Sequence, residues 1–106
     1  MKKSVIPLEL IKKIEQSSPM YLWIMTYGIS HNVMKLAIHQ GDFMNRDEVI
    51  CGGCFYFSGP TKGGPYRIEI SEENHNSPQQ SFIIKGTPND KNLDNLMIKC
   101  HRIQMQ

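Results

Sequence analysis

The feature that most constrains the fold is a series of short segments with strand-type residues, separated by turn-forming residues. In the clearest of them, Tyr66, Ile68 and Ile70 alternate with polar residues, the pattern of a strand with one buried face. The first two segments flank a short turn and predict an antiparallel hairpin. The segments that predict strands are residues 20–27, 33–39, 48–58, 66–71 and 82–85.

Helical patterns occur near both ends of the sequence. After Pro7, the side chains of Leu10, Ile11 and Ile14 form one apolar face, which predicts a short N-terminal helix. Residues 88–103 have apolar residues at helical spacing, although part of the segment also alternates like a strand, and we favour the helix. The predicted fold class is α+β: an antiparallel sheet of about five strands with an N-terminal helix and a C-terminal helix or sixth strand.

The apolar faces of these segments define an expected core. Residues 21–26 are apolar on both faces, whereas an antiparallel sheet usually has one wet face, so we expect a homodimer to cover the second one. The expected core residues are Leu10, Ile11, Ile14, Leu22, Ile24, Met34, Leu36, Ile38, Phe55, Phe57, Ile68, Ile70, Phe82, Ile84 and Leu96.

Length and charge exclude several classes of protein. The 106 residues fit a single domain, residues 1–106. A net charge of +2 argues against a nucleic-acid partner, and the longest apolar run, residues 20–25, is too short to span a membrane. Three cysteines are an odd number, and no signal-peptide pattern is present. We therefore expect a cytoplasmic protein without disulfide bonds.

Cys51-Gly-Gly-Cys54 is the sharpest local motif, and three interpretations remain open. A thiol redox pair should be followed by a helix, but strand-type residues follow here. A zinc site would need further ligands, for which Cys100 and His101 are the candidates. Free cysteines are often simply buried as small apolar residues, which is the interpretation we favour. We expect no cofactor, with zinc at Cys51, Cys54, Cys100 and His101 as the alternative.

A second group of candidates combines aromatic rings with cations. Tyr56, Lys62, Tyr66 and Arg67 could form a binding surface on the sheet, although aromatic residues in such strands more often belong to the core.

Function is inferred from the sequence largely by elimination. The sequence has no cofactor fingerprint and no nucleophile motif, so it favours a protein that is not an enzyme. Sheet edges and glycine-rich loops commonly bind other proteins. We therefore expect a small protein-interaction module, with another protein as its partner. The alternative is a small zinc-binding or thiol-active protein that uses Cys51 and Cys54.

Overall fold

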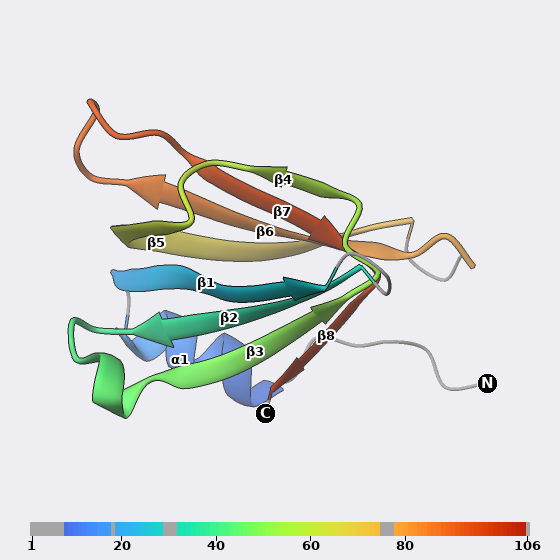
Figure 1. Ribbon diagram of the computed structural model, residues 1–106, viewed down its shortest axis with the longest axis horizontal. Coiled ribbons are helices and arrows are strands. Elements are labelled where there is room, and N and C mark those ends of the chain that lie inside the picture. The colour runs from blue at the N-terminus through green and yellow to red at the C-terminus, as the bar shows by residue number, and fades with distance from the viewer. Residues whose placement is uncertain (1–7, 18, 29–31, 75–77, 106) are drawn as a thin grey trace.

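A computed structural model describes residues 8–17, 19–28, 32–74 and 78–105. These residues form one sheet of eight antiparallel strands, in the order β4-β7-β6-β5-β1-β2-β3-β8, with one short helix and a 3-10 turn (Figure 1). The elements are α1 (Leu8–Ser17), β1 (Met20–Gly28), β2 (Val33–His39), η1 (Phe43–Asn45), β3 (Asp47–Gly52), β4 (Tyr56–Ser58), β5 (Lys62–Glu73), β6 (Ser81–Pro88), β7 (Leu96–Cys100) and β8 (Arg102–Met105).

The predicted α+β class with about five strands is therefore wrong. The N-terminal helix and the hairpin of β1 and β2 are confirmed. The C-terminal segment forms β7 and β8 instead of a helix, because Leu96, Ile98 and Cys100 point into the core at every second position. The segment predicted as one strand, residues 48–58, forms two strands, β3 and β4, which are separated by residues 53–55.

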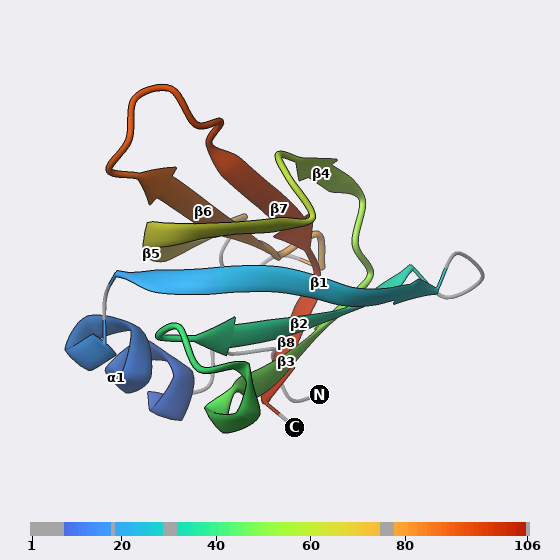
Figure 2. The same ribbon diagram turned by 60° about the vertical axis from the view of Figure 1, so that its left-hand side comes forward.

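The sheet curls until its two ends meet. In sequence β8 follows β7 after a single residue, yet β7 pairs with β4 and β6 whereas β8 pairs with β3. Figures 1 and 2 show the two halves of the sheet converging where β7 passes into β8. Because β3–β4 and β7–β8 each act as one long bent strand, the eight strands form a barrel of six.

A β-bulge bends these two long strands. On one side of it Tyr56 lies opposite Lys99, and on the other Gly52 lies opposite Arg102. Residues 53–55 therefore face only Cys100 and one further residue, so one strand carries an extra residue. The amide of Phe55 donates to the carbonyl oxygen of Lys99 at 3.0 Å, which holds the two strands together across the bulge.

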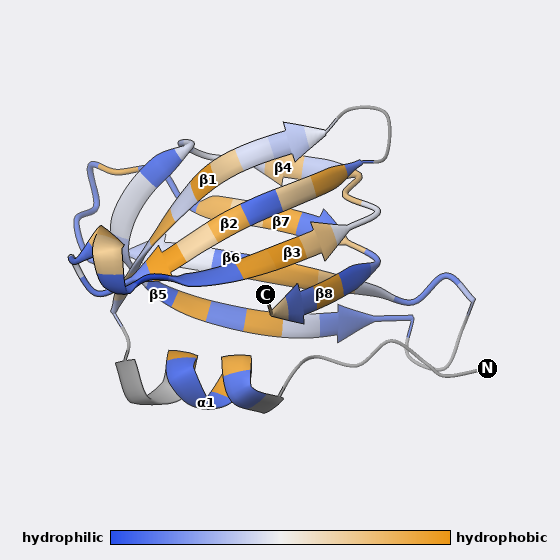
Figure 3. Ribbon diagram, turned by 60° about the horizontal axis from the view of Figure 1, so that its bottom comes forward, coloured by the Kyte–Doolittle hydropathy of each residue, from blue (hydrophilic) through white to orange (hydrophobic). Residues whose placement is uncertain are grey.

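One hydrophobic cluster fills the interior, and α1 adds Leu10 and Ile14 to it. Figure 3 shows α1 across the sheet with its apolar positions turned toward the strands. Most of the expected core residues are confirmed as buried or as packed against the cluster. Phe55 and Phe57 are exposed, so their assignment to the core is wrong. Among the described residues, no helix is long and apolar enough to cross a membrane.

The outward face of β1 is covered by side chains of the same chain. Trp23 packs edge-on against His39, with ring centroids 4.5 Å apart, and stacks on Phe43 at 5.2 Å. His39 is buried, and its Nδ1 accepts a hydrogen bond from the amide of Gly41. Its Nε2 has no hydrogen-bond partner among the described residues, and burial lowers the pKa of His39. This cluster accounts for Tyr21 and Trp23 on the outward face of β1.

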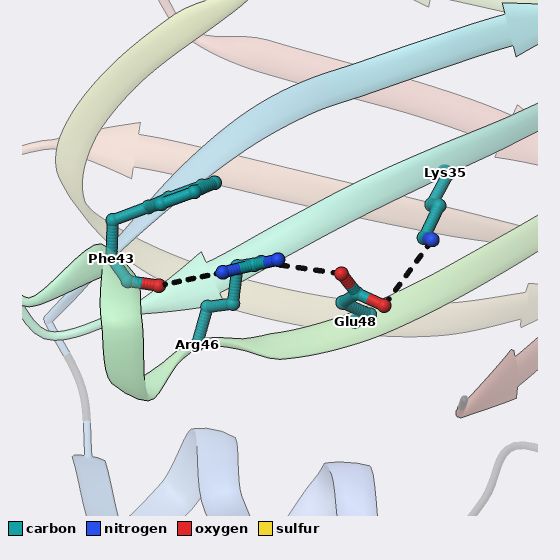
Figure 4. A network of polar contacts seen from close by, with 4 residues as sticks. All are labelled: Lys35, Phe43, Arg46 and Glu48. Atoms are coloured by element: carbon teal, nitrogen blue, oxygen red, sulfur yellow. Dashed lines mark hydrogen bonds and ion pairs between the residues drawn. The ribbon is translucent and has the colours of Figure 1, made fainter.

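Polar contacts fix the loop that carries Phe43 (Figure 4). Arg46 donates to the carbonyl oxygen of Phe43 and to the carboxylate of Glu48, each at 3.2 Å, and its guanidinium carbon lies 4.3 Å from the Phe43 ring centroid. Lys35 reaches the same carboxylate at 3.3 Å. The hydrogen bond from Lys35 is the largest cause of the lowered pKa of Glu48. The network therefore holds Phe43 over Trp23.

Candidate functional site

An apolar groove of about 550 Å³ opens between β4 and the far half of β1. The four aromatic side chains that line it are substantially exposed to solvent, with exposed fractions of 47% for Tyr27, 54% for Phe55, 46% for Tyr56 and 36% for Phe57. The lining residues are Ile24, Tyr27, Asn32, Met34, Cys54, Phe55, Tyr56, Phe57 and Thr61, and none of them is charged.

The bulge and the shortness of β4 explain why three consecutive aromatic residues are exposed. β4 has only three residues, and among the residues that the structure describes it pairs with β7 alone. Phe55 lies in the bulge, where its ring packs on His101 at 4.9 Å between centroids. The Lys99 Nζ lies 5.4 Å from the ring centroid of Tyr56. The exposure of Phe55 and Phe57 was not predicted from the sequence, because the alternation of side chains along a strand favours burial of both on its core-facing side.

Two strand edges border the groove. β1 pairs with β5 only as far as Trp23, and one further bond runs from the Ile24 amide to the Thr61 carbonyl oxygen at 2.7 Å. Beyond Ile24, β1 pairs with β2 alone within the described residues. β4 also has no backbone partner on one of its two sides among the described residues. Backbone N–H and C=O groups of β1 and β4 are thus available beside exposed aromatic rings.

Three cysteines meet behind this groove at the bulge. All three are free thiols, and only Cys54 lines the groove. Cys51 and Cys100 are completely buried, whereas Cys54 is 5% exposed. The Cys54 Sγ donates to the carbonyl oxygen of Cys51 at 3.3 Å. The amide of Cys54 donates to the carbonyl oxygen of Asn32 at 2.8 Å, which anchors the bulge to the end of β2.

The three thiols influence one another's pKa. Hydrogen bonds from Cys100 and then Cys51 stabilise a thiolate at Cys54 and lower its pKa. The pKa of Cys51 is raised by its hydrogen bonds with Cys100 and Cys54 and by burial. At Cys100, the hydrogen bond with Cys51 favours the thiolate, but the contact with Cys54 and burial outweigh it and raise the pKa. Of the three thiols, only Cys54 has a lowered pKa.

The structure brings together three of the four predicted zinc ligands. His101 is exposed, and its Nδ1 is 3.0 Å from the carbonyl oxygen of Gln80. It remains close enough to Cys54 for its charge to help lower the pKa of that thiol. In the part of the chain that the structure describes, no group of three or more His, Cys, Asp or Glu side chains is arranged to hold a metal ion. Zinc at Cys51, Cys54, Cys100 and His101 stays a prediction from the sequence.

The four predicted binding residues do not form one surface. Tyr56 lines the groove, and Lys62 follows the lining residue Thr61, with its Nζ 5.3 Å from the ring centroid of Trp23. Tyr66 is buried, and a Cβ added to Gly86 would lie 3.0 Å from its ring, so the glycine leaves room for the tyrosine. Arg67 is exposed and lies 3.9 Å from Glu69.

No protein-family model matches this chain, and comparisons with curated proteins and with solved structures give no match either. Function is therefore inferred from the groove and the thiol cluster.

Proposed function

We propose that the chain is a non-enzymatic protein-interaction module that binds an extended segment of another protein in the groove beside β4. One observation carries the proposal: two strand edges, of β1 and β4, border the same groove, and four exposed aromatic side chains surround it. An extended segment that adds to a sheet edge gains main-chain hydrogen bonds, and neighbouring pockets select its side chains.

The groove also suggests the chemistry of that segment. Its lining is apolar and aromatic, so it would take apolar side chains from the partner. Lys99 and Lys62 flank it and make no ion pair with a described residue. A segment with apolar residues at alternate positions and acidic residues at its ends would match both features.

Binding to selected peptides tests the proposal. Peptides enriched from a displayed random library on the wild-type protein would be labelled and titrated by fluorescence polarisation. Truncating a central aromatic contact typically costs more than about 1.4 kcal/mol, so Tyr56→Ala and Phe57→Ala should each weaken binding about tenfold. Met44→Ala is the matched control, because Met44 is an exposed apolar residue in η1 that does not line the groove.

Peptides with N-methylated amides separate edge pairing from simple apolar contact. Methylation removes the N–H donors, so methylating alternate amides should abolish binding in one register and spare it in the other. Binding that is unaffected by both aromatic substitutions, or by methylation in either register, would show that the groove is not the binding site.

A homodimer and a cytoplasmic location complete the proposal. The groove supports the dimer, because a β4 edge of a second copy offers the same kind of extended, aromatic segment. Sedimentation or light scattering across a range of protein concentrations tests this, with Phe57→Ala as the variant expected to dissociate. A mass that stays monomeric at the highest concentration would remove the dimer and leave binding to other proteins intact.

A further inference from the structure

The second half of β5 has a strand edge of its own. β5 pairs with β1 only through Lys62, Gly63 and Tyr66, and beyond Tyr66 it pairs with β6 alone within the described residues. We call residues 67–73 the β5 edge. Figure 3 shows α1 beside this part of β5. Because the backbone groups of a helix bond within the helix, α1 leaves the N–H and C=O groups of the β5 edge available.

An apolar cavity of about 270 Å³ lies between α1 and the β5 edge. Its lining residues are Ile11, Ile14, Ile68, Glu69 and Ile70. Ile14 and Ile68 are buried, whereas Ile11 and Ile70 are only half-buried and leave apolar surface open at the cavity. Smaller apolar cavities accept a benzene ring, so this one would accept an aliphatic side chain.

The helix that forms one wall of the cavity is fixed in place. Leu10 and Ile14 of α1 belong to the hydrophobic core, and Lys13 forms an ion pair with Asp47 of β3. The space between α1 and the β5 edge is therefore formed before a ligand arrives. A preformed site binds more tightly, because less ordering has to accompany binding.

The exposed side chains of the β5 edge are mostly acidic. They are Arg67, Glu69, Ser71, Glu72 and Glu73. Glu69 also lines the cavity, and its contact with Arg67 is long, at 3.9 Å, and open to solvent, so it is weak. Glu73 makes no ion pair with a described residue. The β5 edge therefore favours a positively charged ligand.

We propose that the β5 edge and α1 form a second binding site, which takes an extended basic segment of another protein. The segment would add to β5 as a strand, place one apolar side chain in the cavity and pair a lysine or arginine with Glu69. This inference goes beyond the proposed function, because the two sites share no lining residue and the groove beside β4 is flanked by lysines. The chain would then join two partners of opposite charge.

Selection from two displayed peptide libraries on the wild-type protein tests the proposal. One library alternates lysine or arginine with random apolar residues, and the other alternates aspartate or glutamate with them. We expect binders from the basic library to slow amide hydrogen exchange at every second residue of the β5 edge, because the alternate N–H groups already bond to β6. Binders from the acidic library should leave exchange at the β5 edge unchanged.

Three variants locate the contacts of a basic binder, with Trp23 fluorescence as the check of folding. Glu69→Lys should weaken binding at least ~10-fold, because it replaces attraction with repulsion. Asp94→Lys is the matched control: it makes the same charge change at an exposed loop residue and should leave binding unchanged. Ile11→Ala should weaken binding about tenfold, because it removes a wall of the cavity.

Phe57→Ala separates this site from the groove beside β4, because it should weaken binding there and leave the basic binder unaffected. Failure to select any binder from the basic library would overturn the proposal. Equal losses with Glu69→Lys and Asp94→Lys, or exchange that slows in β4 and not at the β5 edge, would do the same. Slow exchange at all of these amides in the free protein would also overturn it, by showing that the chain itself or a second copy occupies the edge.

Discussion

Replacing Gly53 by alanine tests the bulge that shapes both the groove and the thiol cluster. Gly53 has a φ of 65°, in the left-handed region, which costs a residue with a Cβ about 1–2 kcal/mol. An added Cβ would also lie 3.1 Å from the Cβ and Cδ2 of His101, a contact that requires the neighbour to shift. Strain of this kind costs about 1 kcal/mol at its lower end. Together the two effects predict a loss of about 2–3 kcal/mol of unfolding free energy.

Urea unfolding followed by the fluorescence of Trp23 measures this loss, which corresponds to a melting temperature lower by about 10 °C for a domain of this size. Gly28→Ala is the matched control, because its added Cβ would meet only the Val33 carbonyl oxygen, at 3.9 Å. We expect this variant to be unchanged or slightly more stable. Gly53→Asn separates the two causes: asparagine tolerates the left-handed region but keeps the contact with His101, so it should recover about half of the loss. If Gly53→Ala and Gly28→Ala unfold at the same urea concentration, the account of the bulge is wrong.

Three other measurements test separate parts of the structure. Leu22→Ala should destabilise the protein by about 3 kcal/mol because it leaves a cavity in the core, whereas Leu93→Ala, at an exposed site, should change the unfolding free energy by less than about 0.5 kcal/mol. The lowered pKa of His39 means that, as pH falls through 6.5, the unfolded chain takes up a proton that the folded chain does not. Stability should therefore decline below pH 6.5 until the pH passes the folded pKa, and His39→Gln should flatten this decline in urea titrations. Elemental analysis of protein purified without chelator tests the zinc prediction; we expect less than one zinc per chain, and stoichiometric zinc would contradict the expectation that the protein has no cofactor.

Local patterns predicted the elements whose partners are close in sequence. The helix followed from the apolar face of Leu10 and Ile14, and the first hairpin from two strand patterns around one turn. The C-terminal segment was mispredicted because its apolar spacing fits both a helix and a strand, and pairing with β6 and β3 decides between them.

The candidate site depended on pairing between distant parts of the chain. Cys100 joins Cys51 and Cys54 only because β7–β8 lies beside β3–β4, and the exposed aromatics follow from a one-residue change of register. Cys100 is a candidate ligand together with Cys51 and Cys54, and the glycine pair 52–53 is typical of a bulge, but neither pattern predicts which strands pair. Tyr66 shows the same limit: its alternation correctly predicts a half-buried strand, but only the structure shows that its ring lies inside against Gly86.

Curling of the sheet limits how this protein could aggregate through the strand edges at the groove. An open eight-stranded sheet would offer two long edges on which chains could stack into fibrils. Here the edges at the groove are short: β4 has three residues, and β1 is without a second partner only beyond Ile24 among the described residues. So few backbone pairs cannot hold an unselected strand against the entropy of ordering it. Indefinite chain-on-chain growth at the groove is thereby disfavoured, while a segment whose side chains fill the groove can still be retained.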